Sequence, residues 1–118
     1  MAEVGLEYAE QPCATVPELQ QLRERLDRNG IDVALAADES IRKADDPIAV
    51  ARTGAVAYAV VKGAPLGGVT RLRRIAGQLN ALGVQVVVSS ALDTSVVLAT
   101  GVHAAACLPG APLACGLA

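Results

Sequence analysis

The sequence predicts an α/β fold in which parallel strands alternate with helices. Short apolar runs of strand length alternate along the chain with longer segments whose apolar residues recur three and four positions apart. Helix-capping residues, glycines or prolines mark most of the boundaries between these segments. Strands that alternate with helices pair in parallel through right-handed crossovers, because a tight turn cannot join parallel neighbours. Since no linker or low-complexity stretch interrupts the pattern, residues 1–118 are predicted to belong to one domain.

The first strand and helix are predicted from an apolar run and a capping motif. Gly5–Glu10 has the pattern of a strand, and Val16–Asn29 that of a helix with its leucines on one face. Thr15 and Glu18 have the spacing of a capping box, in which each side chain binds the backbone N–H of the other residue. Gly30 follows at the position where a left-handed residue commonly ends a helix.

The later elements follow from the same signals. Asp32–Ala37 is predicted to be a strand, followed by a helix near Pro47–Thr53 with Asp46 as its N-cap and Gly54 as its stop. The remaining predicted elements are strands over Ala57–Lys62 and Val84–Ser89, helices over Val69–Leu82 and Ser95–Leu108, and the beginning of a fifth strand at Leu113–Cys115.

Composition and charge restrict the class of partner. The chain is 53% hydrophobic and has 11 glycines but no Phe or Trp, so Ala, Val and Leu must form most of the core. Its formal net charge is −2, whereas nucleic-acid binding needs clustered positive charge. No apolar run approaches the roughly 18 to 20 residues of a membrane-spanning helix. We therefore expect a small-molecule ligand and neither a nucleic-acid nor a membrane partner.

The cysteines and the acidic N-terminal segment favour a cytoplasmic protein. Cys13, Cys107 and Cys115 are odd in number and lack paired spacing, which fits neither a disulfide framework nor a zinc site. Glu3 and Glu7 stand where a secretory signal would carry a basic and then an apolar region. The three thiols are expected to be reduced.

Each predicted strand ends in a polar or ionisable side chain. These residues are Glu10, Asp38, Lys62 and the pair Ser89 and Ser90, one position for each strand–helix unit. Because parallel strands bring their carboxyl ends to one edge of a sheet, we expect the side chains to lie along that edge. In barrels and doubly wound sheets this edge binds ligands. The spacing therefore predicts an active-site rim.

The residue types at this rim indicate a hard divalent cation and an anionic substrate. Glu10 and Asp38 could be two oxygen ligands of an incomplete Mg²⁺ set, and Lys62 could stabilise developing negative charge. The alternative is that the carboxylates cap helices or are solvated and that Lys62 is a surface lysine paired with Asp38. The turn at Gly63–Gly68 precedes a helix and could hold an anion, although it matches no phosphate-binding fingerprint.

Five segments carry a resemblance to a known family. They are YAEQPC at Tyr8–Cys13, ALAADES at Ala34–Ser40, VVKGAPLGG at Val60–Gly68, VVVSSALDTSV at Val86–Val96 and PLACGL at Pro112–Leu117. Together they resemble the o-succinylbenzoate synthase family of the enolase superfamily, in its muconate-lactonising-enzyme-like subgroup. The EQP and ADES pieces are shared with dipeptide epimerases and N-acylamino-acid racemases of the same superfamily.

The resemblance implies a fold and a set of residue roles. The chain would be the C-terminal part, about strands four to eight, of a (β/α)₈ TIM barrel. Glu10 and Asp38 would be the second and third Mg²⁺ ligands, and Lys62 would stabilise the enolate. Ser89, Ser90 and Gly116 would then contact the carboxylate substrate.

The reaction implied by the resemblance is a lyase step of menaquinone biosynthesis. It is the Mg²⁺-dependent dehydration of 2-succinyl-6-hydroxy-2,4-cyclohexadiene-1-carboxylate to 2-succinylbenzoate. The family's N-terminal capping domain, its Lys-x-Lys pair and its first Asp ligand have no counterpart in this sequence. The chain is therefore expected to be an inactive partial domain that self-associates through exposed barrel edges.

Two other functions remain open at this stage. The first is that of a racemase or epimerase of the same superfamily, which would need lysines on both sides of the substrate. The second is that of a non-catalytic half-barrel module that binds an anion at the turn over Gly63–Gly68.

Overall fold

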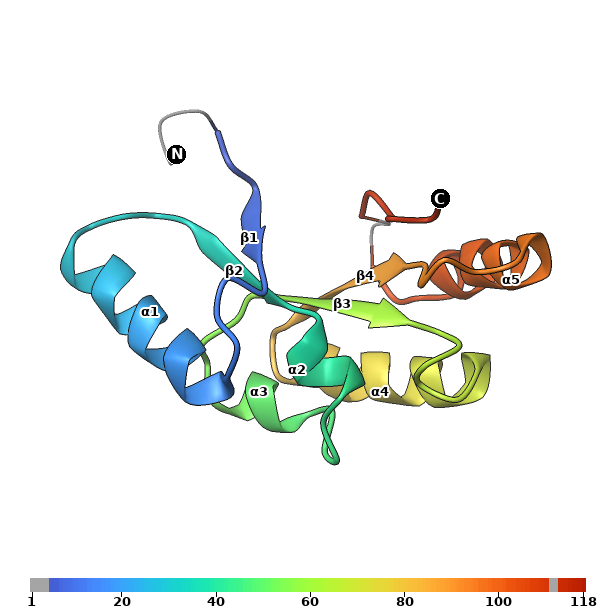
Figure 1. Cartoon of the computed structure of the whole chain (residues 1–118), viewed down its shortest axis with the longest axis horizontal. Coiled ribbons are helices and arrows are strands. Elements are labelled where there is room, and N and C mark those ends of the chain that lie inside the picture. The colour runs from blue at the N-terminus through green and yellow to red at the C-terminus, as the bar shows by residue number, and fades with distance from the viewer. Residues whose placement is uncertain (1–4, 111–112) are drawn as a thin grey trace.

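The computed structural model describes residues 5–110 and 113–118 and contains a four-stranded parallel sheet (Figure 1). The strands lie in chain order as β1 (Tyr8–Glu10), β2 (Ala34–Ala37), β3 (Tyr58–Lys62) and β4 (Gln85–Ser89). Every neighbouring pair is parallel, as the alternation of strands and helices predicted. The segments between neighbouring strands carry helices, because a parallel pair needs a long crossover.

Five helices are described in the structure. They are α1 (Val16–Arg28), α2 (Glu39–Arg42), α3 (Ala49–Arg52), α4 (Val69–Ala81) and α5 (Ser95–Ala106). In Figure 1, α2, α3 and α4 lie on the same side of β3, and α5 lies beyond the end of β4 that leads towards the C-terminus. No helix within residues 5–110 and 113–118 has the length and apolar character needed to cross a membrane.

Helix α1 begins and ends as its sequence predicted. The Thr15 backbone N–H donates to the Glu18 carboxylate at 2.9 Å, and the Glu18 N–H donates to the Thr15 hydroxyl at 3.4 Å, which completes the capping box. Gly30 has φ +65°, the left-handed conformation expected of a residue that ends a helix. The buried face of α1 places Leu19 fully inside the core.

Two predictions about the elements were wrong, and one helix was not predicted at all. That helix is α2, a single turn that follows Asp38 and buries Ile41. Asp46 does not cap α3, which begins after Ile48; its carboxylate instead accepts the Ile48 N–H at 3.0 Å. Leu113–Cys115 is not a strand, since the fifth strand position holds only an isolated parallel bridge between Ser89 and Gly116.

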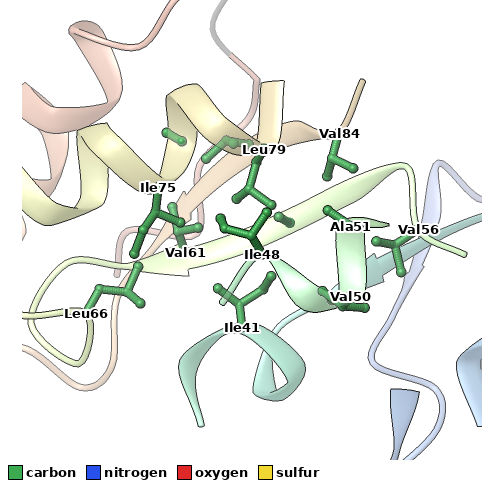
Figure 2. Close-up of a cluster of buried hydrophobic side chains, with 14 of the residues drawn as sticks. Ile41, Ile48, Val50, Ala51, Val56, Val61, Leu66, Ile75, Leu79 and Val84 are labelled. Atoms are coloured by element: carbon green, nitrogen blue, oxygen red, sulfur yellow. The ribbon is translucent and has the colours of Figure 1, made fainter. Parts of the chain in front are cut away.

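The main hydrophobic core lies between the sheet and the helices that cover one of its faces. Figure 2 shows side chains from α2, α3, α4 and β3 meeting there, among them Ile41, Ile48, Val61, Ile75 and Leu79. Because strand residues alternate between faces, Leu35 and Ala37 of β2 belong to this cluster whereas Ala36 does not. Full burial of each large aliphatic side chain stabilises the fold by roughly 1.5 to 3 kcal/mol.

The opposite face of the sheet carries a much smaller apolar cluster. Ala36, Val60 and Val87 are buried there, and the rings of Tyr8 and Tyr58 lie 5.0 Å apart beside them. Both tyrosines are only partly buried. This face therefore contributes less apolar burial, and its strands lead to the polar residues at the carboxyl edge.

Candidate active site

Four of the predicted rim residues lie along one edge of the sheet. Glu10, Lys62 and Ser89 are the last residues of β1, β3 and β4, and Asp38 directly follows β2. Side chains two residues apart on a strand point to the same face of the sheet. The side chains of Glu10, Lys62 and Ser89 therefore extend from the face that carries Tyr8, Val60 and Val87. Lys62 and Ser89 also stand opposite each other in the register of β3 and β4.

Asp38 and Lys62 form the centre of this edge. Asp38 is 5% exposed, and its Oδ2 accepts from the Lys62 ammonium, whose side chain is also largely buried. The Arg42 Nε lies 3.4 Å from the other carboxylate oxygen. A buried carboxylate is strongly destabilised unless it is paired, and Asp38 has a cationic partner at each of its two oxygens.

The pairing of Lys62 with Asp38 matches the non-catalytic interpretation of that lysine in one respect. The two side chains do form an ion pair, but neither is on the surface: their side-chain exposures are 14% and 7%. A partly desolvated ammonium at a strand end has a stronger electrostatic effect on nearby charge than an exposed one. The geometry is therefore compatible with a role in stabilising an anion.

Gln11 holds the segment that carries Asp38, a role that was not predicted from the sequence. Its Oε1 accepts the backbone N–H of Asp38 at 2.9 Å and that of Ser40 at 3.2 Å. Its Nε2 donates to the Ser40 hydroxyl at 2.9 Å and to the Cys13 carbonyl at 2.9 Å. Two signals pointed to it: its place directly after the strand that ends in Glu10, and its membership of the EQP piece that carries the family resemblance.

Glu10 is exposed, in contrast to Asp38. Its Cα is in register with Ala36, two residues before Asp38, so the two carboxylates belong to adjacent strand ends. Burial, followed by the negative charges of Glu10 and Glu7, raises the pKa of Tyr8. Glu10 stands two residues after Tyr8 on β1, which places both side chains on the same face of the sheet.

The carboxylates at this edge have the oxygen chemistry that suits a magnesium ion. Carboxylate oxygens are the ligands that Mg²⁺ prefers, and this ion usually binds one or two carboxylates while keeping several waters. Glu10 and Asp38 fit that role as a pair from neighbouring strands. Among the residues that the structure describes, no group of three or more His, Cys, Asp or Glu side chains comes together, so the pair is at most a partial ligand set.

Ser89, Ser90 and Gly116 meet at the other end of the edge. The Ser89 hydroxyl donates to the Gly116 carbonyl at 3.1 Å, and the Ser90 backbone N–H donates to the same oxygen at 2.9 Å. A Cβ on Gly116 would lie 2.9 Å from the Ser89 hydroxyl, so no larger residue fits without a shift. An apolar cavity of about 160 Å³ opens beside Ser89 and is lined also by Gly63, Val97 and Leu117.

The structure thus brings together Asp38 with Lys62, and Ser89 with Ser90 and Gly116. It places Glu10 on the neighbouring strand end without a contact to either group among the described residues. Cys13, Cys107 and Cys115 form no disulfide in the part of the chain that the structure describes.

Comparison with known proteins shows which proteins this chain resembles. The chain is 56% identical over 116 residues to the o-succinylbenzoate synthase of Mycobacterium ulcerans (strain Agy99), covering 98% of this chain and 33% of that protein. The chain therefore spans about a third of the length of the curated relatives that it matches.

Two solved structures share the fold. One is 2-chloromuconate cycloisomerase from Rhodococcus opacus 1CP, with a TM-score of 0.82 and 29% identity over 98% of this chain and 31% of that chain. The other is dipeptide epimerase from Enterococcus faecalis V583, with a TM-score of 0.84 and 20% identity over 98% and 33%. Both likenesses agree with the parallel β/α architecture and with a chain that matches only part of a larger protein.

The family model described as enolase C-terminal domain-like matches residues 1–118. The parallel sheet, the charged residues at its carboxyl edge and this match over the whole chain lead to one conclusion: the chain belongs to the enolase C-terminal domain-like family.

Proposed function

We propose that this chain supplies part of the active site of a Mg²⁺-dependent o-succinylbenzoate synthase. The reaction would be dehydration of 2-succinyl-6-hydroxy-2,4-cyclohexadiene-1-carboxylate to 2-succinylbenzoate. The observation that carries the proposal is the buried Asp38–Lys62 pair at the carboxyl edge of a parallel sheet, in a chain 56% identical to a protein of that name. Such an edge is where barrel enzymes hold their chemistry.

Glu10 and Asp38 would hold the ion, and Lys62 would stabilise the enolate. When bound, Mg²⁺ would supply a positive charge that stabilises the enolate of the substrate carboxylate as the α proton leaves. The Lys62 ammonium lies at the strand end next to Asp38, so its charge is fixed in place before the reaction begins. Preorganised positive charge of this kind lowers the barrier because it needs no rearrangement in the transition state.

Ser89, Ser90 and Gly116 would bind the carboxylate substrate at the far end of the edge. Both serine hydroxyls now approach the Gly116 carbonyl, at 3.1 and 3.3 Å, and a hydroxyl can rotate to donate to a substrate oxygen instead. Gly116 allows this close approach, because a Cβ at its position would lie 2.9 Å from the Ser89 hydroxyl.

The metal role of Asp38 can be tested in the full-length protein that carries residues 1–118. Replacing Asp38 by Ala removes an anionic oxygen ligand, so we expect Mg²⁺ affinity to fall by roughly 10-fold to 100-fold or more. Asp46→Ala is the matched control, since that carboxylate is exposed and pairs with Arg52 away from the edge. Calorimetric titration with Mg²⁺ measures both variants, and equal affinity of Asp38→Ala and the parent would reject the proposed site.

Residues 1–118 alone are proposed to be inactive and to self-associate. The described carboxylates form only a partial ligand set, and loss of a catalytic acid or base typically lowers the rate about 10² to 10⁴-fold. The outer edge of β1 has no neighbouring strand among the described residues, and an unpaired edge favours association. A dehydratase assay and light scattering on the purified chain test both points; normal turnover or a uniform monomer would contradict them.

A racemase or epimerase is the second candidate, favoured by the likeness to the epimerase fold. A racemase needs proton transfer on both faces of the substrate, whereas a dehydratase needs one base. We therefore propose to incubate the full-length protein in D₂O with both enantiomers of an N-acylamino acid. Exchange of the α proton in both enantiomers, without dehydration of the cyclohexadiene substrate, would favour the second candidate.

A further inference from the structure

Gln11 uses the whole hydrogen-bonding capacity of its side chain on the segment that carries Asp38. A glutamine amide has two donors and a carbonyl oxygen with two lone pairs. Here both donors are used, on Ser40 and Cys13, and the oxygen accepts two backbone N–H groups, those of Asp38 and Ser40. These contacts span up to 29 residues of sequence, so they join the β1 loop to the β2 loop.

The backbone of Gln11 is fixed in an unusual conformation that makes these contacts possible. Its φ is +38°, in the left-handed region that non-glycine residues seldom adopt. Its N–H donates to the Ala36 carbonyl at 2.8 Å, which continues the β1–β2 pairing by one residue past Glu10. Such conformations persist only where surrounding contacts hold them in place.

Asp38 is the N-cap residue of α2, yet its carboxylate makes no capping hydrogen bond. An aspartate at this position ordinarily accepts a backbone N–H from the first turn of its helix. In this protein the Gln11 oxygen accepts the Ser40 N–H instead, which leaves one Asp38 oxygen for Lys62 and the other for Arg42. Gln11 thus caps the helix, and Asp38 pairs with the two cations.

We propose that Gln11 is a positioning residue: by capping α2 in place of Asp38, it keeps the Asp38 carboxylate turned towards Lys62 and available to a divalent cation. The cation part of this inference rests on the proposed function. Without Gln11, the Asp38 carboxylate becomes the nearest acceptor for the Ser40 N–H and turns back to cap its own helix. Its pairing with Lys62 and its availability as a ligand are then lost together.

Three variants of the full-length protein separate the contributions. Gln11→Ala removes all four side-chain hydrogen bonds. Gln11→Glu keeps an oxygen for the Asp38 and Ser40 N–H groups, so it is the conservative rescue. Ser40→Ala is the matched control, because it removes only the hydroxyl partner and leaves both backbone contacts to Gln11 intact.

Amide hydrogen exchange gives a readout that does not depend on any metal. We expect Gln11→Ala to speed exchange at Asp38 and Ser40 by about tenfold, the size expected for losing one hydrogen bond. Gln11→Glu and Ser40→Ala should stay within about threefold of the parent, since each keeps acceptors for these N–H groups. Unchanged exchange at both amides in Gln11→Ala would overturn the proposal.

Mn²⁺ titration, used as a spectroscopic probe in place of Mg²⁺, measures the effect on the carboxylate. We expect Gln11→Ala to raise the Mn²⁺ Kd by about 10 to 100-fold, the range found when residues that orient a ligand are removed. Faster exchange with an unchanged Kd would overturn the proposal, because Gln11 would then hold the backbone without orienting Asp38. A parent that binds no Mn²⁺ would reject the proposed function and the cation part of this inference together, and the exchange result would still accept or reject the capping of α2 by Gln11.

Discussion

The two faces of the sheet differ in what holds their side chains in place. On the helix-covered face, aliphatic residues from β2, β3, β4 and all five described helices form one large cluster with exposures of 9% or less. On the opposite face, Ala36, Val60 and Val87 are buried beside two partly exposed tyrosines, and the strands end in charged or hydroxyl side chains. The first face is held by apolar contact, whereas the rim of the second is held by hydrogen bonds and ion pairs.

Because of this difference, neighbouring residues of one strand can serve different purposes, one packing in the core and the next reaching the candidate site. Val61 faces the core and Lys62, the next residue, faces the rim, so a single strand serves both purposes. The helix-covered face tolerates only changes that conserve volume, because a packed interior leaves no room for others. The rim depends instead on the charge of its side chains and on the direction in which they point. Substitutions on the two faces should therefore move different measured quantities.

The largest expected effect is on stability, from the helix-covered face. Leu72 of α4 is fully buried, so Leu72→Ala should lower the free energy of unfolding by about 2 to 5 kcal/mol. Leu82→Ala is the control, since Leu82 is 46% exposed and should change stability by about 0.5 kcal/mol. Urea denaturation measures both variants. Equal losses would show that α4 does not pack as described.

Lys62→Ala should affect turnover far more than folding. We expect kcat of the full-length protein to fall by about 10² to 10³-fold, as when a preorganised charge donor is removed. The fold should survive because Arg42 still faces Asp38. Lys43→Ala, which removes an exposed lysine from the loop after α2, is the control. If Lys62→Ala turns over substrate as fast as the parent, the rim is not the active site.

Gly116→Ala should have a smaller effect, because its added methyl group meets only one side chain. A Cβ there would lie 2.9 Å from the Ser89 hydroxyl, and overpacking of this kind costs about 1 to 3 kcal/mol. Gly77→Ala in α4 should instead stabilise the protein by about 0.5 to 1 kcal/mol, since nothing lies within 4 Å of its added Cβ. Opposite shifts in Tm are the expected result; shifts of the same sign would contradict the close approach at Ser89.

The smallest effect concerns an exposed carboxylate, Asp46. A hydrogen bond from the Ile48 N–H, and then one from the Arg52 guanidinium, lowers the pKa of Asp46 in the folded state. A lowered pKa gives stability that is present above the unfolded value of about 3.9 and is lost as the pH falls through the folded pKa. Asp46→Asn should therefore flatten the decline of Tm below about pH 5. An identical decline in both proteins would show that this contact contributes nothing.

The sequence was sufficient for the elements whose signals are local. The capping box at Thr15 and Glu18 and the glycine after α1 depend on residues close in sequence, and the structure has them as predicted. Helix α2 was missed because its single turn depends on burial of Ile41 and on a cap from Gln11, 29 residues away from Ser40. The prediction of a fifth strand was wrong because a strand forms only where the segment pairs in register with β4. Residues 113–115 do not themselves encode that register.

The same distinction applies to the site. The polar residues at strand ends could be predicted because strand–helix alternation determines which side chains reach one edge. The Asp38–Lys62 contact was anticipated only as an alternative, since spacing does not say which way two side chains turn. Gln11 could not be assigned because its partners, the N–H groups of Asp38 and Ser40, are defined only once the two loops meet.

The order of the strands has a consequence for how the chain is made. Each strand pairs with the one synthesised directly before it, from β1 through β4. A newly made strand–helix unit can therefore dock on an edge that already exists, without waiting for a distant partner. Synthesis releases the N-terminal part of a chain first, at about 5 to 20 residues per second. The strand order therefore permits vectorial growth of this sheet, in which each added unit covers the exposed edge left by the last one and exposes a new edge in turn.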